Sequence, residues 1–137
     1  PLLDGSEGLI VACGTLLGAA VNAARRLREE GLDVGVINAR FVKPLDSRLL
    51  LERIEAAPWV VTVEENALQT GFGSAVLEAV HDARIGTGPI VRLGLPDRFV
   101  EHGERGELLA ELGLDAAGIA QTCRALAGVM PAHGTRQ

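Results

Sequence analysis

The segment that decides the fold reads "WVVTVEENALQTGFGSAV", residues 59–76. Its first six residues, 59–64, are apolar enough to form a strand buried on both faces, which is typical of a parallel sheet covered by helices. Two adjacent glutamates and a glycine-rich turn follow, and a helical pattern then runs from about residue 73 to 83. The turn has two interpretations: an active site with a carboxylate pair and a phosphate cradle, or scaffolding for a site elsewhere.

Three further apolar runs have the length and composition of buried strands: residues 9–13 (LIVAC), 34–38 (VGVIN) and 90–94 (IVRLG). Helical patterns separate these runs, so strand and helix alternate along the chain. This alternation predicts an α/β fold with a parallel sheet and helices on both of its faces.

Helix boundaries are marked by capping residues. Thr15 is the expected N-cap of the first helix, and Gly31 is its expected stop. Asp46 is expected to cap the second helix. Asp115 is expected to cap the last helix, after a short helix around residues 105–112. The apolar faces of the first and last helices comprise Leu16, Ala20, Ala23, Ala24 and Leu27, and Ile119, Cys123 and Leu126.

Length and charge limit the classes of protein. The 137 residues suit one domain, which we place at residues 1–127 with a boundary remnant at 1–8 and a flexible tail at 128–137. The net charge is −5 without a basic patch, so a nucleic-acid partner is not expected. No apolar stretch approaches the roughly 20 residues of a membrane span, so we expect no membrane partner.

The cysteines and histidines are not expected to form a metal site. Cys13 and Cys123 lack ligand-like spacing, and His81, His102 and His133 form no cluster with them. Buried free thiols are typical of a reducing compartment, so a cytoplasmic protein is expected.

Neither chemical interpretation of the glycine-rich turn fits well. A dinucleotide fingerprint needs a small residue where Val76 stands, and the strand ends about six residues too early for the tight turn. Glu64 and Glu65 are adjacent in a strand, so their carboxylates diverge and cannot converge on one substrate. The alternative is a helix N-terminus with glycines for steric clearance, and a glutamate that caps a neighbouring turn or reaches a partner domain.

Two more loops carry polar residues at the expected carboxyl ends of the strands, where parallel sheets usually bind ligands. The last loop holds Asp97, Arg98, Glu101 and His102. This set has acid/base groups but no serine or cysteine nucleophile, which favours a structural or interface role. Lys43 and Arg40 flank Phe41, a pattern more typical of a contact surface than of a substrate site.

Several stretches, in this order and spacing, resemble a known family: "NARFVKPLD", "VTVEENA", "GFGSAVLE", "GLPDRFVEHG" and "ELLAELGLDAAGI". Over residues 8–127 they are similar to the C-terminal domain of the 1-deoxy-D-xylulose 5-phosphate synthases. Transketolases and the beta subunits of pyruvate dehydrogenase are more distant relatives. The resemblance implies a three-layer α/β/α sandwich with a mostly parallel sheet of four to five strands, of the transketolase C-terminal type.

The resemblance also implies an activity for the parent enzyme. Such synthases condense pyruvate with glyceraldehyde 3-phosphate and release carbon dioxide, using thiamine diphosphate and Mg²⁺. The product feeds isoprenoid, thiamine and pyridoxal phosphate synthesis. In this family the cofactor and substrate residues belong to the preceding domains, and the Gly-Asp-Gly…Asn motif for magnesium diphosphate is absent from this chain. We therefore assign no catalytic, cofactor-binding or metal residue to it.

What the family's loops imply here is an interface, with the preceding domains or with the partner subunit of a homodimer. The candidate interface residues are Lys43, Glu64, Glu65, Asn66, Gly71, Gly73, Ser74, Pro96, Asp97, Arg98 and His102. Two alternatives stay open: the C-terminal domain of another thiamine enzyme, and a free-standing α/β module that binds a ligand or a protein.

Overall fold

The computed structural model describes residues 5–39, 48–67, 72–95 and 113–129. The elements in chain order are β1 (Gly8–Ala12), η1 (Gly14–Leu16), α1 (Leu17–Glu29), β2 (Val34–Asn38), α2 (Arg48–Ala56), β3 (Val60–Ala67), α3 (Phe72–Ala83), β4 (Ile90–Leu95) and α5 (Ala116–Val129). All four predicted strands are present, each within a few residues of its expected bounds. Asp46 and the helix predicted at 105–112 lie outside the described residues.

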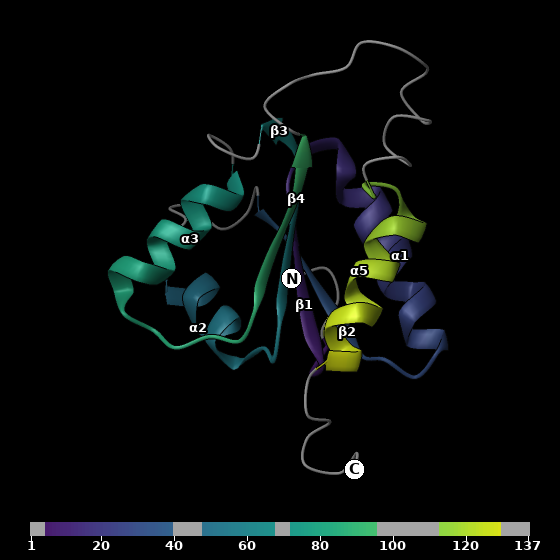
Figure 1. Ribbon diagram of the computed structural model, residues 1–137, viewed down its shortest axis with the longest axis horizontal. Coiled ribbons are helices and arrows are strands. Elements are labelled where there is room, and N and C mark those ends of the chain that lie inside the picture. Colours follow the sequence, from purple (N-terminus) through teal and green to yellow (C-terminus); the bar gives the residue numbers. More distant parts are fainter. Residues whose placement is uncertain (1–4, 40–47, 68–71, 96–112, 130–137) are drawn as a thin grey trace.

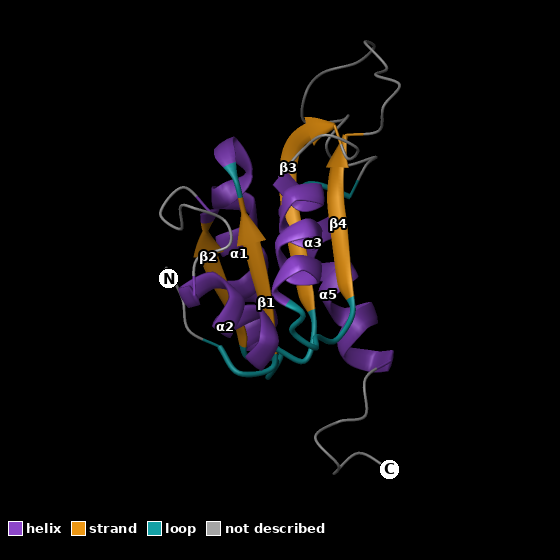
Figure 2. Cartoon of the chain, turned by 90° about the vertical axis from the view of Figure 1, so that its left-hand side faces the viewer, coloured by secondary structure: helices purple, strands orange, loops and turns teal. Residues whose placement is uncertain are grey.

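The four strands form one parallel sheet in the order β2-β1-β3-β4. Because the strands are parallel, their carboxyl ends lie at one edge of the sheet, as Figure 2 shows. The described residues contain no fifth strand. Residues just before β1 instead bond to the turn before β2, where Glu7 N donates to Asp33 O at 2.8 Å and Asp33 N donates to a Glu7 carboxyl oxygen at 2.9 Å.

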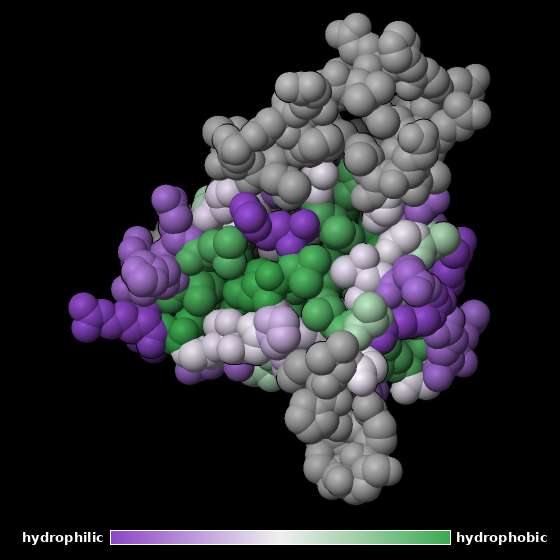
Figure 3. Space-filling model, viewed as in Figure 1, coloured by the Kyte–Doolittle hydropathy of each residue, from purple (hydrophilic) through white to green (hydrophobic). Residues whose placement is uncertain are grey.

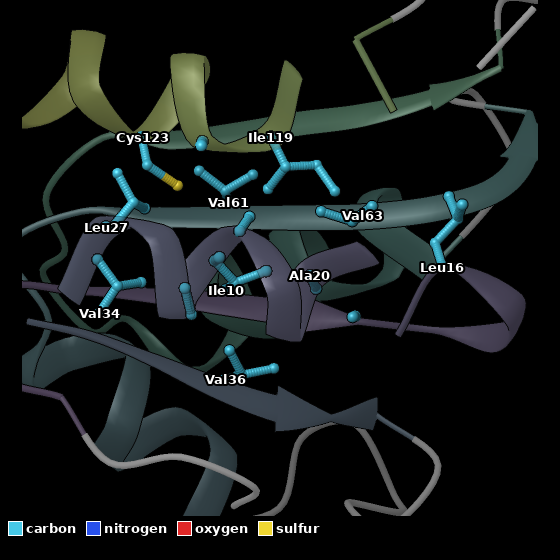
Figure 4. Close-up of a cluster of buried hydrophobic side chains, with 14 of the residues drawn as sticks. Ile10, Leu16, Ala20, Leu27, Val34, Val36, Val61, Val63, Ile119 and Cys123 are labelled. Atoms are coloured by element: carbon cyan, nitrogen blue, oxygen red, sulfur yellow. The ribbon is translucent and has the colours of Figure 1, made fainter. Parts of the chain in front are cut away.

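Helices cover both faces of the sheet, which confirms the predicted three layers. α2 and α3 lie on one side, and α1 and α5 on the other (Figure 1). Alternate residues of β1 point to opposite faces, so Ile10 joins the core under α1 and α5 while Leu9 and Val11 join the core under α2 and α3. Figure 4 shows the first core, in which β1, β2 and β3 meet α1 and α5.

α1 buries the predicted face but begins later than predicted. Its buried residues, together with Leu16 just before it, are Ala20, Ala23, Ala24 and Leu27. The expectation that Thr15 caps this helix is wrong, because Leu16 is the N-cap and no side chain bonds there. A short 3-10 turn, η1, begins at Gly14 (φ 76°) and delays the start of α1 to Leu17. Gly31, with φ 91°, provides the predicted stop.

α5 confirms the predicted cap. Gly118 N donates to Asp115 Oδ1 at 2.8 Å, and Leu114 and Ile119 beside the cap are both fully buried. The helix runs to Val129, two residues into the segment predicted as a tail, and residues 130–137 lie outside the described ranges.

An ion pair on the surface joins α5 to the end of α1. Arg124 donates from Nε and Nη2 to the two carboxyl oxygens of Glu30 at 2.8 and 2.6 Å. These bonds lower the pKa of Glu30 and raise the pKa of Arg124.

Cys123 and Cys13 are both free thiols, but only Cys123 is fully buried. Burial raises the pKa of the Cys123 thiol to about 12, because its apolar surroundings disfavour the charged thiolate more than nearby Arg124 favours it. At pH 8 roughly one Cys123 in ten thousand is then ionised.

We therefore expect a thiol reagent such as DTNB to leave Cys123 unlabelled in the folded chain at pH 8 and to label both cysteines in denaturant. Absorbance at the thionitrobenzoate band counts the reacted thiols. A Cys13→Ser variant isolates the signal of Cys123, and its rapid labelling in that folded variant would contradict the expectation.

Candidate functional site at the carboxyl edge of the sheet

The candidate site lies where β3 and β4 end and α3 begins. Glu64 belongs to β3, while Gly73 and Ser74 lie in the first turn of α3. Glu65 and Asn66 are also part of β3, and only their backbone is described. The other candidates lie outside the described residues: Lys43, Gly71, Pro96, Asp97, Arg98 and His102.

β3 does not stop at Glu64, as the sequence suggested, but continues through an irregularity to Ala67. Val63 pairs with Leu93 and Ala67 pairs with Leu95, so β3 advances four positions where β4 advances two. The extra residues of β3 fall at the two glutamates and the asparagine. Such bulges break the regular ladder and are frequent beside functional sites.

Glu64 caps the start of α3. Its side chain is 0% exposed, and Oε2 accepts a hydrogen bond of 2.5 Å from Gly73 N. The first amides of a helix lack partners within the helix, and the helix dipole favours a negative group beside them. The expectation that one of the two glutamates caps a neighbouring turn is thus fulfilled by Glu64.

Gly73 leaves no room for a side chain. A Cβ atom built there would lie 2.8 Å from Thr62 Oγ1, 3.0 Å from Glu64 Oε2 and 3.1 Å from Arg92 Cδ. The interpretation that a glycine of this turn provides steric clearance therefore holds at this position. A phosphate at this amide would meet the Glu64 carboxyl group, so the geometry favours a helix cap over a phosphate cradle.

Arg92 of β4 forms a hydrogen bond with the first turn of α3. Its Nη1 donates to Ser74 Oγ at 3.0 Å. Sequence reasoning did not single out Arg92, although a charged residue in the middle of the apolar run "IVRLG" is the signal that could have identified it. Its partner was not recognisable, because Ser74 is 18 residues away in the chain.

Thr62 is the second residue that sequence reasoning missed. It pairs with Arg92 in the ladder between β3 and β4 and is 0% exposed. Among the described residues its Oγ1 has no hydrogen-bond partner. A buried hydroxyl without a partner lowers stability, which makes Thr62 a weak point of this cluster.

β4 presents an apolar edge beside this cluster. It pairs with β3 on one side and with no strand of the described residues on the other. Ile90, Val91 and Leu93 are half-buried, and Figure 3 shows an apolar surface over β4 between α3 and α5. An open, apolar strand edge is a template for contact with another segment or chain.

The described part of the chain contains no cluster of metal ligands and no membrane-spanning helix. In it, no three histidine, cysteine, aspartate or glutamate residues gather as a metal site would require. None of its helices has the length and apolarity needed to cross a membrane. What the described cluster can do is hold α3 against the ends of two strands.

A family model agrees with this architecture. Residues 2–119 match the model described as "Transketolase, C-terminal domain". The chain belongs to this family. The resemblance noted in its sequence is thereby confirmed at the level of the domain.

Curated relatives of this transketolase C-terminal domain include several synthases. It is 51% identical over 124 residues to the 1-deoxy-D-xylulose-5-phosphate synthase of Synechococcus sp. (strain JA-2-3B'a(2-13)), covering 90% of the chain and 19% of that protein. It is 50% identical over 118 residues to synthase 2 of Geobacter sulfurreducens, covering 86% of the chain and 19% of that protein. The domain thus spans about a fifth of the length of these relatives.

Solved structures confirm the fold. A split-gene transketolase, described as an inactive beta4 tetramer, superposes with a TM-score of 0.80 at 31% identity, over 93% of this domain and 41% of that chain. A transketolase from Pichia stipitis, described as a complex with xylulose 5-phosphate, gives a TM-score of 0.58 at 19% identity, over 91% of this domain and 17% of that chain. The second likeness bears on the fold alone.

Replacing Thr62 by valine should stabilise the domain by about 1 kcal/mol, because it removes a buried hydroxyl without a partner and keeps the shape of the side chain. Urea unfolding followed by the fluorescence of Trp59, the single tryptophan, measures the change. Thr62→Ser keeps the hydroxyl and removes a methyl group, so it should destabilise. A loss of stability in Thr62→Val would show that the hydroxyl is satisfied.

Gly73→Ala should lower the free energy of unfolding by about 1–3 kcal/mol, because the steric conflict with Thr62 outweighs the better helix propensity of alanine. Gly18 is the matched control, since it is also the second residue of its helix and a Cβ there would meet no atom within 4 Å. Gly18→Ala should raise stability by up to about 1 kcal/mol. Equal responses of the two variants in urea unfolding would disprove the steric argument.

Proposed function

We propose that this transketolase C-terminal domain belongs to a 1-deoxy-D-xylulose-5-phosphate synthase and serves there as a structural and interface domain. The observation that carries the proposal is its identity of 46–51% to such synthases over 86–91% of the chain. Its identity to the split-gene transketolase is 31%. Transketolase is the second candidate for the parent enzyme, since that structure superposes closely.

The parent synthase would condense pyruvate with glyceraldehyde 3-phosphate, with loss of carbon dioxide, in the cytoplasm. Thiamine diphosphate with Mg²⁺ would supply the carbanion chemistry. The described residues do not offer the start of α3 to that cofactor, since Glu64 already accepts from the Gly73 amide, and the sequence lacks the Gly-Asp-Gly…Asn motif. We therefore assign cofactor, metal and substrates to the preceding domains.

The proposed role of this chain is to dock onto the preceding domains and the partner subunit of a homodimer. Two features support it. The edge of β4 is apolar and open on one side within the described residues. In its described part, the carboxyl edge of the sheet carries Glu64, Gly73 and Ser74 in a cluster that holds α3 in place.

The test compares the isolated chain with the intact parent enzyme. Calorimetry should show no thiamine diphosphate binding to the isolated chain, whereas the intact enzyme should bind the cofactor and consume pyruvate with glyceraldehyde 3-phosphate. The parent lacking these 137 residues should lose its dimer and its turnover. Micromolar cofactor binding by the isolated chain would refute the assignment, and turnover with a ketose donor in place of pyruvate would identify a transketolase.

A further inference from the structure

The first turn of α3 is bonded to two strands by two successive residues. Gly73 N donates to Glu64 Oε2 of β3 at 2.5 Å, and Ser74 Oγ accepts from Arg92 Nη1 of β4 at 3.0 Å. The turn therefore bridges the carboxyl ends of β3 and β4 on the side of the sheet covered by α2 and α3. Each of these two bonds holds the turn to one of the two strands.

The bond to Glu64 lies where the main-chain pairing of the two strands becomes irregular, whereas Arg92 lies in the regular part of β4, opposite Thr62. Regular pairing runs from Val60 with Ile90 to Val63 with Leu93, and the next pair is Ala67 with Leu95. Glu64 is the first residue after the regular ladder. Beyond this point the backbone ladder no longer fixes the spacing of the strands residue by residue, and the bonds of Glu64 and Arg92 to the first turn of α3 add a constraint there.

The first turn of α3 is also closely packed against the two strands. Thr62, Glu64 and Arg92 all lie within 3.1 Å of the position that a Gly73 side chain would occupy. Glu64 and Thr62 are fully buried, so neither can exchange its contacts for water without moving the helix. These close contacts hold the helix start in place relative to the two strands.

We propose that Glu64 and Arg92 are positioning residues, which fix the first turn of α3 against β3 and β4 and thereby set how the ends of these strands are presented to the preceding domains. The inference rests on the proposed docking function. It assigns to Glu64 an effect on docking that acts through α3, without contact between its carboxyl group and the partner.

The experiment uses the full-length enzyme and the 137-residue chain, with Glu64→Gln and Ser74→Ala. The first removes the charge of the cap but keeps an acceptor, and the second removes the acceptor of Arg92. Glu30→Gln is the matched control, because it also removes a hydrogen-bonded carboxylate, in this case the one that Arg124 binds on the surface between α1 and α5. Hydrogen exchange followed by mass spectrometry and sedimentation of the dimer are measured for each.

Each variant at the carboxyl edge should speed amide exchange at Gly73 about tenfold, the effect of losing one charge-assisted hydrogen bond. The dissociation constant of the dimer should rise by about the same factor. The exchange rates of α1 amides such as Ala24, and the affinity of the assembled enzyme for thiamine diphosphate, should stay within about twofold of the wild-type values. Glu30→Gln should change none of these quantities.

Two other outcomes separate the two proposals. Suppose that residues 60–95 exchange equally fast in the wild-type enzyme and in the isolated chain, and that the dimer forms without this domain. The docking function itself is then wrong. In the second outcome, the wild-type enzyme protects these residues from exchange, but Glu64→Gln and Ser74→Ala have the same dimer dissociation constant as Glu30→Gln. The docking function then stands, and the positioning role is overturned.

Discussion

The rest of the structure depends on one constraint: the central strands β1 and β3 are apolar on both faces. All five residues of β1 are buried, and so are Val60, Val61 and Val63 of β3. Such strands are stable only between two layers of helices. Parallel pairing meets this need directly, because each crossover between parallel strands supplies a helix that covers one face.

The same parallel arrangement explains where the polar residues gather. Parallel strands bring their carboxyl ends to one edge, and the helix that follows β3 begins there with free amide groups. Glu64 uses this opportunity, since a buried carboxyl group needs a donor and Gly73 N provides one. A pair of glutamates that resembles an active site in the sequence is thus, in its described member, part of the scaffold.

Local signals in the sequence were the reliable ones. The strands at residues 34–38 and 90–94, the apolar face of α1 and the Asp115 cap followed from periodicity and short-range chemistry, and the structure confirms them. The Thr15 cap failed because a 3-10 turn over Gly14–Leu16 displaced the helix start. Helix propensity does not specify whether a capping residue begins the 3-10 turn or the α-helix that follows it.

The sequence by itself determined the α/β class and the family, because these depend on composition, period and motif order. Only the tertiary structure decided the strand order, the bulge after Val63 and the clamp formed by Glu64, Gly73, Ser74 and Arg92. The physical reason is distance along the chain. Arg92 and Ser74 meet only after two strands and a helix have packed, and no local preference of either residue encodes that contact.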